Sequence, residues 1–402
     1  MQLNNKHIAA IVIVTVGVVA GIYTMNAKQA DQPKTETTSQ QGSGLPSGHP
    51  PLSQSGKVTP DPNAKFSHFR VGNSNVKSIY IDGKVVWVGT SGGVIRYDTG
   101  TDEYRMFNVT NDLLSNGVFN VGKLGDYIAA DTYGGGLSLY DQKQDSWENL
   151  NVPNGLADAF VYKTLKASNG DIWIATWSGA NRILGGDLHD RSKWEMYTVE
   201  NTNGGLPNDW VYSLEEGKDG VIWLATEGGL ARFKDGKRQN WNHEKGVGAS
   251  FETVKNDPQF GTDPAKLSEH HAKQKKEMGL GDTGVAFNPN YIVALAVDRE
   301  GVVWCGTWGG GLARYDGNKW RNYTMADGLP GNHVFMLHVD PSGKLWIGTN
   351  NGLASFDSGK FKVFTTDDGL FSNTIFSMAT APDGSQWIGS FGGVTHLAVA
   401  AK

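Results

Sequence analysis

Two side chains next to recurring strands could perform acid–base chemistry. Glu227 and His333 adjoin recurring apolar strands in two copies of a repeated motif, and they could act as an acid and a base. His243, His270 and His271 could form a metal site together with His333. Adjacent histidines point in different directions on a helix, however, and the sequence has no His-x3-His pair. We therefore expect a non-enzymatic protein without a metal or another cofactor, and both sets remain alternatives.

Aromatic residues at two recurring positions offer a different chemistry, which is binding by stacking. The first position follows a recurring Thr or Ser and reads Ser91, Tyr133, Trp177, Glu227, Trp308, Asn350 and Phe391. The second precedes an apolar strand and reads Asn75, Gly117, Phe160, Trp210, Tyr291, His333 and Thr374. A position that varies this widely among copies of one unit is not dictated by packing, so it is free to serve binding.

The candidate ligand-binding set is drawn from both series. These residues are Tyr133, Phe160, Trp177, Trp210, Glu227, Tyr291, Trp308, His333, Asn350 and Phe391. Large aromatic faces suit a planar or sugar-like ligand, or an anchor residue of a partner protein. In the alternative interpretation, some of these side chains pack beneath an inserted segment as its local core.

A repeated unit must position these residues. Its template is Asp340-Pro-Ser-Gly-Lys-Leu-Trp-Ile-Gly-Thr349, a turn followed by an apolar strand. Alignment on the final hydroxyl residue gives seven copies, at Thr90, Thr132, Thr176, Thr226, Thr307, Thr349 and Ser390. The intervals of 42, 44, 50, 81, 42 and 41 residues match a four-stranded propeller blade, apart from one insertion. The sequence predicts an all-β, seven-bladed β-propeller over residues 65–402, with both variable positions on one face, which we call the top face.

The ring is expected to close with a strand from its N-terminal end. Each complete repeat ends in an outer strand with two aromatic residues, such as Lys319-Trp-Arg-Asn-Tyr323. The last repeat lacks this strand, whereas Lys65-Phe-Ser-His-Phe69 precedes the first repeat and matches it. Pairing the two leaves no open sheet edge.

Recurring tryptophans and arginines are expected to be structural. Trp87, Trp173, Trp223, Trp304, Trp346 and Trp387 share one strand position, where a large ring fills the wedge between blades. Arg96, Arg182, Arg232 and Arg314 recur on the next strand. Because these residues repeat with the framework, we assign them to packing.

The insertion covers residues 243–290 and must emerge on the top face, because it joins an outer strand to the next inner strand. Asp263 and Pro264 form a helix start, and the pattern predicts a helix that ends near Gly279. We expect the insertion to act as a lid over the channel mouth.

The N-terminal part is expected to anchor the protein. Residues 8–25 form an uncharged apolar run at the lower limit of a membrane span, so we interpret residues 1–27 as an uncleaved single-pass anchor. Residues 28–64 have the composition of a disordered tether. Within it, residues 44–52 are either a spacer or a docking peptide, in which His49 could ligate a metal or haem. The propeller would then lie on the periplasmic side of the inner membrane.

Composition excludes several classes of function. The single cysteine, Cys305, cannot form an intramolecular disulfide or attach haem covalently through a two-cysteine motif. The net charge of −5 gives no basic surface for nucleic acid.

Two segments carry a family resemblance. Asp219-Gly-Val-Ile-Trp-Leu-Ala-Thr-Glu-Gly-Gly-Leu-Ala-Arg-Phe233 and Asp327-Gly-Leu-Pro-Gly-Asn-His-Val-Phe335 resemble the two-component regulator propeller repeat of extracytoplasmic sensor regions in bacterial hybrid histidine kinases. The resemblance implies a propeller that senses ligands, often glycans. Because the sequence shows one propeller and no kinase, it also implies a membrane-embedded or periplasmic protein partner that acts in trans. The family carries no fixed catalytic motif.

Three functions follow as expectations. The first is a non-enzymatic ligand-sensing or protein-binding module. The second is a lyase or hydrolase with Glu227 and His333 on the top face, because the repeat is also distantly similar to that of virginiamycin B lyase. The third is a scaffold subunit of a membrane complex, docked through residues 44–52.

Overall fold

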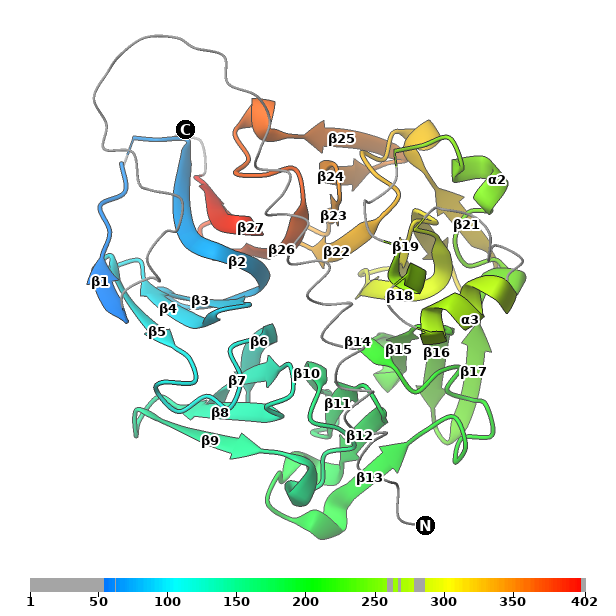
Figure 1. The fold of residues 1–402 in the computed structure, drawn as a ribbon, viewed down its shortest axis with the longest axis horizontal. Coiled ribbons are helices and arrows are strands. Elements are labelled where there is room, and N and C mark those ends of the chain that lie inside the picture. Colours follow the sequence, from blue (N-terminus) through cyan, green and yellow to red (C-terminus); the bar gives the residue numbers. More distant parts are fainter. Residues whose placement is uncertain (1–53, 62, 259–262, 267–268, 278–285, 399–402) are drawn as a thin grey trace.

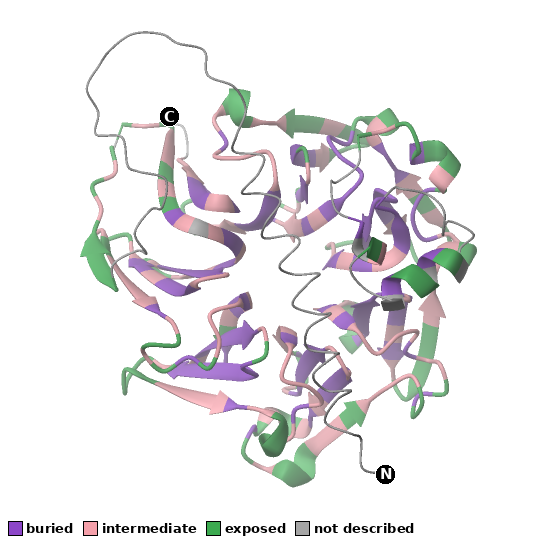
Figure 2. Ribbon diagram, in the orientation of Figure 1, coloured by how far each residue is buried: buried purple, intermediate pink, exposed green. Residues whose placement is uncertain are grey.

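The computed structural model describes residues 54–61, 63–258, 263–266, 269–277 and 286–398 (Figure 1). Its described strands form one seven-stranded and five four-stranded antiparallel sheets around a central axis, so the all-β propeller prediction is confirmed (Figure 1). We number the blades in chain order, and the strand directly before the one that ends in the recurring Thr or Ser is the innermost of its blade. Buried residues fill the blades and exposed residues lie mainly at outer turns (Figure 2).

Blades 1 to 3 contain the strands β1 (Ser55–Lys57), β2 (Phe66–Asp82), β3 (Val85–Thr90), β4 (Gly93–Asp98), β5 (Glu103–Phe107), β6 (Val118–Leu124), β7 (Tyr127–Thr132), β8 (Leu137–Asp141), β9 (Ser146–Leu150), β10 (Val161–Lys166), β11 (Ile172–Thr176), β12 (Gly179–Ile183) and β13 (Trp194–Tyr197). Blades 4 to 7 contain β14 (Val211–Glu216), β15 (Ile222–Thr226), β16 (Gly229–Lys234), β17 (Lys237–Trp241), β18 (Asn288–Val297), β19 (Val303–Trp308), β20 (Leu312–Tyr315), β21 (Trp320–Tyr323), β22 (Val334–Val339), β23 (Leu345–Thr349), β24 (Gly352–Asp357), β25 (Lys360–Phe364), β26 (Ile375–Thr380) and β27 (Gln386–Leu397).

The described helices are short. The insertion carries α2 (Phe251–Val254), α3 (Glu269–Glu277), η5 (His243–Lys245) and η6 (Pro264–Lys266). The remaining 3-10 turns are η1 (Val152–Asn154), η2 (Leu184–Gly186), η3 (Arg191–Lys193), η4 (Lys218–Gly220), η7 (Met325–Asp327) and η8 (Thr366–Asp368). The helix predicted from Pro264 to Gly279 is therefore divided into η6 and α3.

A buried hydroxyl closes the top-face turn of every blade. The recurring Thr, or Ser390 in blade 7, donates to a glycine carbonyl three or four residues later, at 2.8 to 3.0 Å. The turn also requires glycine: Gly93 has a φ of 129°, and a Cβ there would lie 2.1 Å from the carbonyl oxygen of Phe107. The hydrogen bond and the glycine together fix the backbone at the next, variable residue.

A bulge recurs at one position of all seven innermost strands. The pairing register skips one residue in each, namely Lys77, Phe119, Tyr162, Tyr212, Val293, Phe335 and Phe376. Bulges re-aim the extra side chain. We call these seven residues the inner ring.

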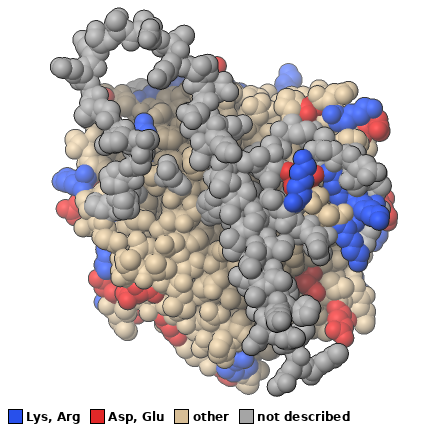
Figure 3. Space-filling model, viewed as in Figure 1, with Lys and Arg blue, Asp and Glu red and all other residues tan. Residues whose placement is uncertain are grey.

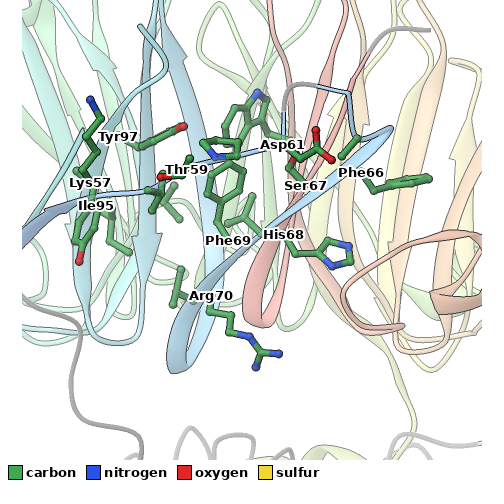
Figure 4. A pocket seen from close by; sticks show the side chains of 18 residues that line it. Lys57, Thr59, Asp61, Phe66, Ser67, His68, Phe69, Arg70, Ile95 and Tyr97 are labelled. Atoms are coloured by element: carbon green, nitrogen blue, oxygen red, sulfur yellow. The ribbon is translucent and has the colours of Figure 1, made fainter. Parts of the chain in front are cut away.

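The N-terminal strand closes the ring, as predicted. The first part of β2 pairs with β27, with Phe66 opposite Leu397 and Phe69 opposite Val394. Phe69 stacks on Trp387 at 5.4 Å and contacts Tyr97 at 5.2 Å between ring centroids (Figure 4). Because β2 then continues into the innermost strand of blade 1, one 17-residue strand joins the first and last blades.

The expected tether is wrong over its last residues. Ser55–Lys57 form β1, which pairs with β5 as an extra outer strand of blade 1. Residues from this stretch and from both seam blades line a pocket of about 540 Å³, with Val58, Phe69 and Trp387 in its wall (Figure 4).

The predicted anchor, the peptide at residues 44–52 and His49 lie outside the described residues. Within the described ranges, no helix combines the length and the apolar character needed to cross a membrane.

The recurring tryptophans pack in the wedges, as predicted. Trp87 is fully buried against Phe107 and Tyr140, with centroids at 6.3 and 5.4 Å. The arginine assignments are also consistent, because Arg182 and Arg232 lie over Trp173 and Trp223. These contacts are framework interactions and leave the top face for other roles.

The seam generates a test of ring closure. Replacing Phe69→Ala removes the ring that packs on Trp387 and Tyr97, and we expect it to lower the free energy of unfolding by about 2–4 kcal/mol in urea titrations. The control Val363→Ala, at an exposed site of outer strand β25, should cost less than about 1 kcal/mol. Equal losses in the two variants would contradict the closing role of Phe69.

Candidate functional site

The two variable series meet at the top face. In blade 3 the backbone N–H of Trp177 donates to the carbonyl of Phe160 at 3.2 Å, and in blade 4 that of Glu227 donates to Trp210 at 3.1 Å. Equivalent bonds join Ser91 to Asn75, Tyr133 to Gly117, and Asn350 to His333. These five blades therefore present one residue of each series side by side.

Five ring contacts link the aromatic members, three of them between neighbouring blades and two within a blade. The centroid distances are 4.6 Å for Tyr133–Phe160, 5.4 Å for Phe160–Trp177, 4.2 Å for Trp177–Trp210, 5.4 Å for Tyr291–Trp308 and 5.3 Å for Trp308–His333. We call the series from Tyr133 to His333 the aromatic arc. It spans blades 2 to 6 and is interrupted between Trp210 and Tyr291.

The insertion fills that interruption with an imidazole. His271 of α3 lies 5.5 Å from the Trp210 ring and 6.0 Å from the Tyr291 ring. Its Nε2 lies 2.7 Å from Oε1 of Glu227, and both side chains are buried. A carboxylate removed from water needs such a partner, so the insertion compensates the one acidic residue of the arc.

Further contacts dock the insertion on blades 4 to 6. Within the insertion, Lys275 forms a buried ion pair with Asp263. His271 and Lys275 are one helical turn apart on α3, so they share a face of the helix. Asp257 accepts a hydrogen bond from the Asn332 side chain at 2.7 Å. His333 donates from Nε2 to the carbonyl of Ala286 at 2.8 Å. The described part of the insertion therefore contacts top-face residues of blades 4 to 6.

Two of the predicted binding residues lie outside the aromatic arc. Asn350 uses its side-chain oxygen to accept from the backbone N–H of His333 at 3.3 Å, which is a local structural contact. Phe391 lies opposite Asn75 where β27 meets β2. Within the described part of the chain, no ring contact connects Phe391 to the arc.

The acid–base alternative finds little support in this geometry. Glu227 and His333 are both fully buried, and each has a structural partner, His271 or the Ala286 carbonyl. Burial lowers the pKa of His333 to about 4, so it stays neutral with Nε2 protonated near neutral pH. Nε2 is therefore not available as a base.

The alternative of a histidine metal site gains no support from the described residues. His243 bonds through Nδ1 to the carbonyl of Val247 at 2.8 Å, whereas His271 contacts Glu227. The side chain of His270 lies outside the described residues. Across the described ranges, no three His, Cys, Asp or Glu side chains come together as metal ligands would.

The inner ring is the part of the site that sequence reasoning missed. Phe119, Tyr162 and Tyr212 form successive contacts at 4.5 and 4.7 Å, and Tyr212 reaches Tyr291 of the arc at 4.6 Å. Phe335 contacts Phe376 at 5.5 Å on the other side. Burial raises the pKa of Tyr162 and Tyr212 well above the ordinary value, so both hydroxyls stay protonated. The signal was available, because this position also varies among copies.

Comparisons with known proteins agree with this fold. Residues 205–228, 286–309 and 328–351 match the family described as two component regulator propeller, so the resemblance is confirmed. No curated protein sequence matches the chain.

Among solved structures, the extracellular domain described as part of a hybrid two component system from B. thetaiotaomicron has a TM-score of 0.64 at 20% identity, over 85% of this chain and 42% of that one. Virginiamycin B lyase from Staphylococcus aureus has a TM-score of 0.57 at 12% identity, over 83% and 99% of the two chains. YCF48 bound to a D1 peptide has a TM-score of 0.54 at 12% identity, over 85% and 100%.

These similarities establish the fold alone. The chain spans about two fifths of the B. thetaiotaomicron domain, 42% of its length. The other two neighbours share the propeller over nearly their whole lengths, and their names describe an enzyme and a peptide-bound protein. Function must therefore be argued from the site.

The buried imidazole of His333 predicts a pH dependence of stability. Its folded pKa of about 4 lies below the ordinary value, so only the unfolded chain takes up a proton as the pH falls from 6.5 towards 4. The stabilisation present above pH 6.5 is lost across this window, by about 3 kcal/mol at most. Urea titrations at pH 7 and pH 4 should show a smaller loss for His333→Gln than for the wild-type protein. The same loss in both would contradict the assignment.

The contact between His271 and Glu227 predicts how α3 is held. Replacing His271→Ala leaves the buried carboxylate without its imidazole partner, and we expect α3 to detach more often. Limited trypsin digestion, followed by mass spectrometry, should then cut at Lys273 or Lys276 roughly tenfold faster than in the wild-type protein. The control Ala272→Ser changes an exposed neighbour on the same helix. If cleavage is equally slow in both variants, His271 does not hold α3.

Proposed function

We propose that this chain is an extracytoplasmic, non-enzymatic propeller that binds a small ligand at the top face and acts as a sensor. The observation that carries the proposal is the aromatic arc, which is continuous from Tyr133 to His333 once His271 is included. A rigid set of aromatic faces with one buried charge is the usual composition of a small-ligand site.

The exposure of the arc supports binding over packing. Tyr133, Phe160, Trp177, Trp210 and Tyr291 are only half-buried, whereas the recurring wedge tryptophans are buried. Half-buried aromatic faces still offer apolar area to a ligand. Only Trp308 and His333 fit the alternative of a packed local core.

The distribution of charge on this side of the molecule also favours a small ligand. On the face seen in Figure 3, the charged side chains lie at the perimeter and on the insertion, and the described surface between them is uncharged. Such a surface gives no extended patch for nucleic acid, in keeping with the net charge of −5.

Glu227 supplies a route from binding to a signal. A ligand that reaches this carboxylate competes with His271, so binding would change how α3 is docked. A ligand shifts a conformational equilibrium only through such a difference in contacts. We propose that a membrane-embedded or periplasmic protein partner detects this change in the insertion.

Location and membrane attachment are part of the proposal. The extracellular origin named for the B. thetaiotaomicron domain supports a propeller outside the cytoplasm. The apolar run at residues 8–25 supports an inner-membrane anchor with the propeller on the periplasmic side.

The tightest contact of the arc provides the test. Trp177→Leu and Trp210→Leu should each weaken binding at least about tenfold, because stacking on large aromatic faces contributes much of the binding energy at such sites. Compounds are first found by thermal-shift screening of the full chain against oligosaccharides and planar aromatic molecules, and they are then titrated by calorimetry.

A matched tryptophan separates binding from folding. Trp320→Leu makes the same change on outer strand β21, where the ring packs against Tyr315, so it should lower stability without changing affinity. Unchanged affinity in both top-face variants would exclude the aromatic arc as the binding site.

A further inference from the structure

Lys77 is the one charged residue of the inner ring. The other six members are aromatic or aliphatic, as their register positions show. All seven occupy the same bulge of an innermost strand, so nothing in the framework requires a cation there. The charge must therefore be explained by something other than blade packing.

In the described part of the chain, the ammonium group has one aromatic contact. Its Nζ lies 4.2 Å from the centroid of Phe376. Among the described residues, no carboxylate forms an ion pair with it and no acceptor forms a hydrogen bond with it. Burial lowers the pKa of Lys77 to about 8, without an opposing contribution from a neighbouring anion. Lys77 is partly exposed, so its ammonium group rests on the Phe376 ring face and stays accessible to a ligand.

The inner-ring neighbours of Lys77 on both sides are phenylalanines. The ring centroids of Phe376 and Phe335 lie 5.5 Å apart, and those of Phe335 and Trp308 of the aromatic arc lie 5.7 Å apart. On the other side, the next inner-ring residue is Phe119. Phenylalanine offers no donor or acceptor, so the hydroxyls of a sugar would remain unsatisfied beside Lys77. A flat, unsubstituted ring loses no hydrogen bonds there and gains stacking contacts.

We infer that Lys77 receives the carboxylate of a planar aromatic acid, whose ring stacks on the phenylalanines of the inner ring. The inference rests on the proposed function. It names the class of ligand that would bind where the inner ring adjoins the aromatic arc. A charge-assisted contact between Lys77 and the acid would supply orientation, while Phe335 and Phe376 would supply the stacking surface.

A pair of probes that differ only in charge tests this assignment. The full chain is titrated by calorimetry with 2-naphthoate and with its neutral analogue, 2-naphthamide. We expect the wild-type protein to bind 2-naphthoate at least about tenfold more tightly, because only the acid pairs with the ammonium. Lys77→Met should abolish this preference and leave the affinity for 2-naphthamide unchanged, whereas Lys77→Arg should keep it.

The unfolding temperature provides a second test, which distinguishes a ligand-binding role of Lys77 from a structural one. Methionine is unbranched and apolar and can keep the packing against Phe376, so Lys77→Met should not lower the unfolding temperature. A fall in the unfolding temperature would show that the ammonium stabilises the fold through Phe376, and the inference would be wrong.

The remaining outcomes separate this inference from the proposed function. Equal binding of both probes, or a preference that survives Lys77→Met, overturns the role of Lys77 and leaves the aromatic site intact. If neither probe binds the wild-type protein, the aromatic-acid class is wrong. The proposed function then still depends on whether Trp177→Leu and Trp210→Leu weaken binding of a screened compound.

Discussion

The buried hydroxyl at the end of each second strand is the interaction on which the functional face depends. In all seven blades it donates to a glycine carbonyl, and the hydroxyl is almost inaccessible to water. This bond satisfies a polar group inside the sheet and fixes the turn that follows. Because the backbone is held independently of the next side chain, that side chain can be serine in one blade and tryptophan in another. A rigid framework with variable attachments is the physical basis of the aromatic arc.

Ring closure imposes the second constraint. A sheet edge left open in blade 7 would expose unpaired backbone groups, and the first part of β2 covers that edge. The same strand then becomes the innermost strand of blade 1, so the crossover at the seam is short: 7 positions separate Phe69 from Val76, against 11 from Phe107 to Val118. In the longer crossover the buried apolar side chain is Leu113. In the seam crossover it is the smaller Val71, which lines the pocket of Figure 4.

Charge is placed sparingly along the axis of this propeller. Glu227 is buried and contacts an imidazole that comes from another part of the chain, whereas Lys77 is partly exposed and lies over the Phe376 ring. A charge removed from water lowers the stability of the fold, and proteins keep such charges mainly where binding or regulation uses them. The framework tolerates both because the locked turns, wedge tryptophans and paired edges stabilise the ring independently of them.

The sequence alone determined the number of repeats, the closing strand, the wedge tryptophans and the two variable series, because each follows from local periodicity and strand alternation. It could not reveal that His271 contacts Glu227, since 44 positions separate them and the contact depends on how the insertion returns to the ring. It also did not identify the inner ring, because a bulge is a property of strand pairing. Tertiary structure decided which of the variable side chains touch, and which charges lie beside them.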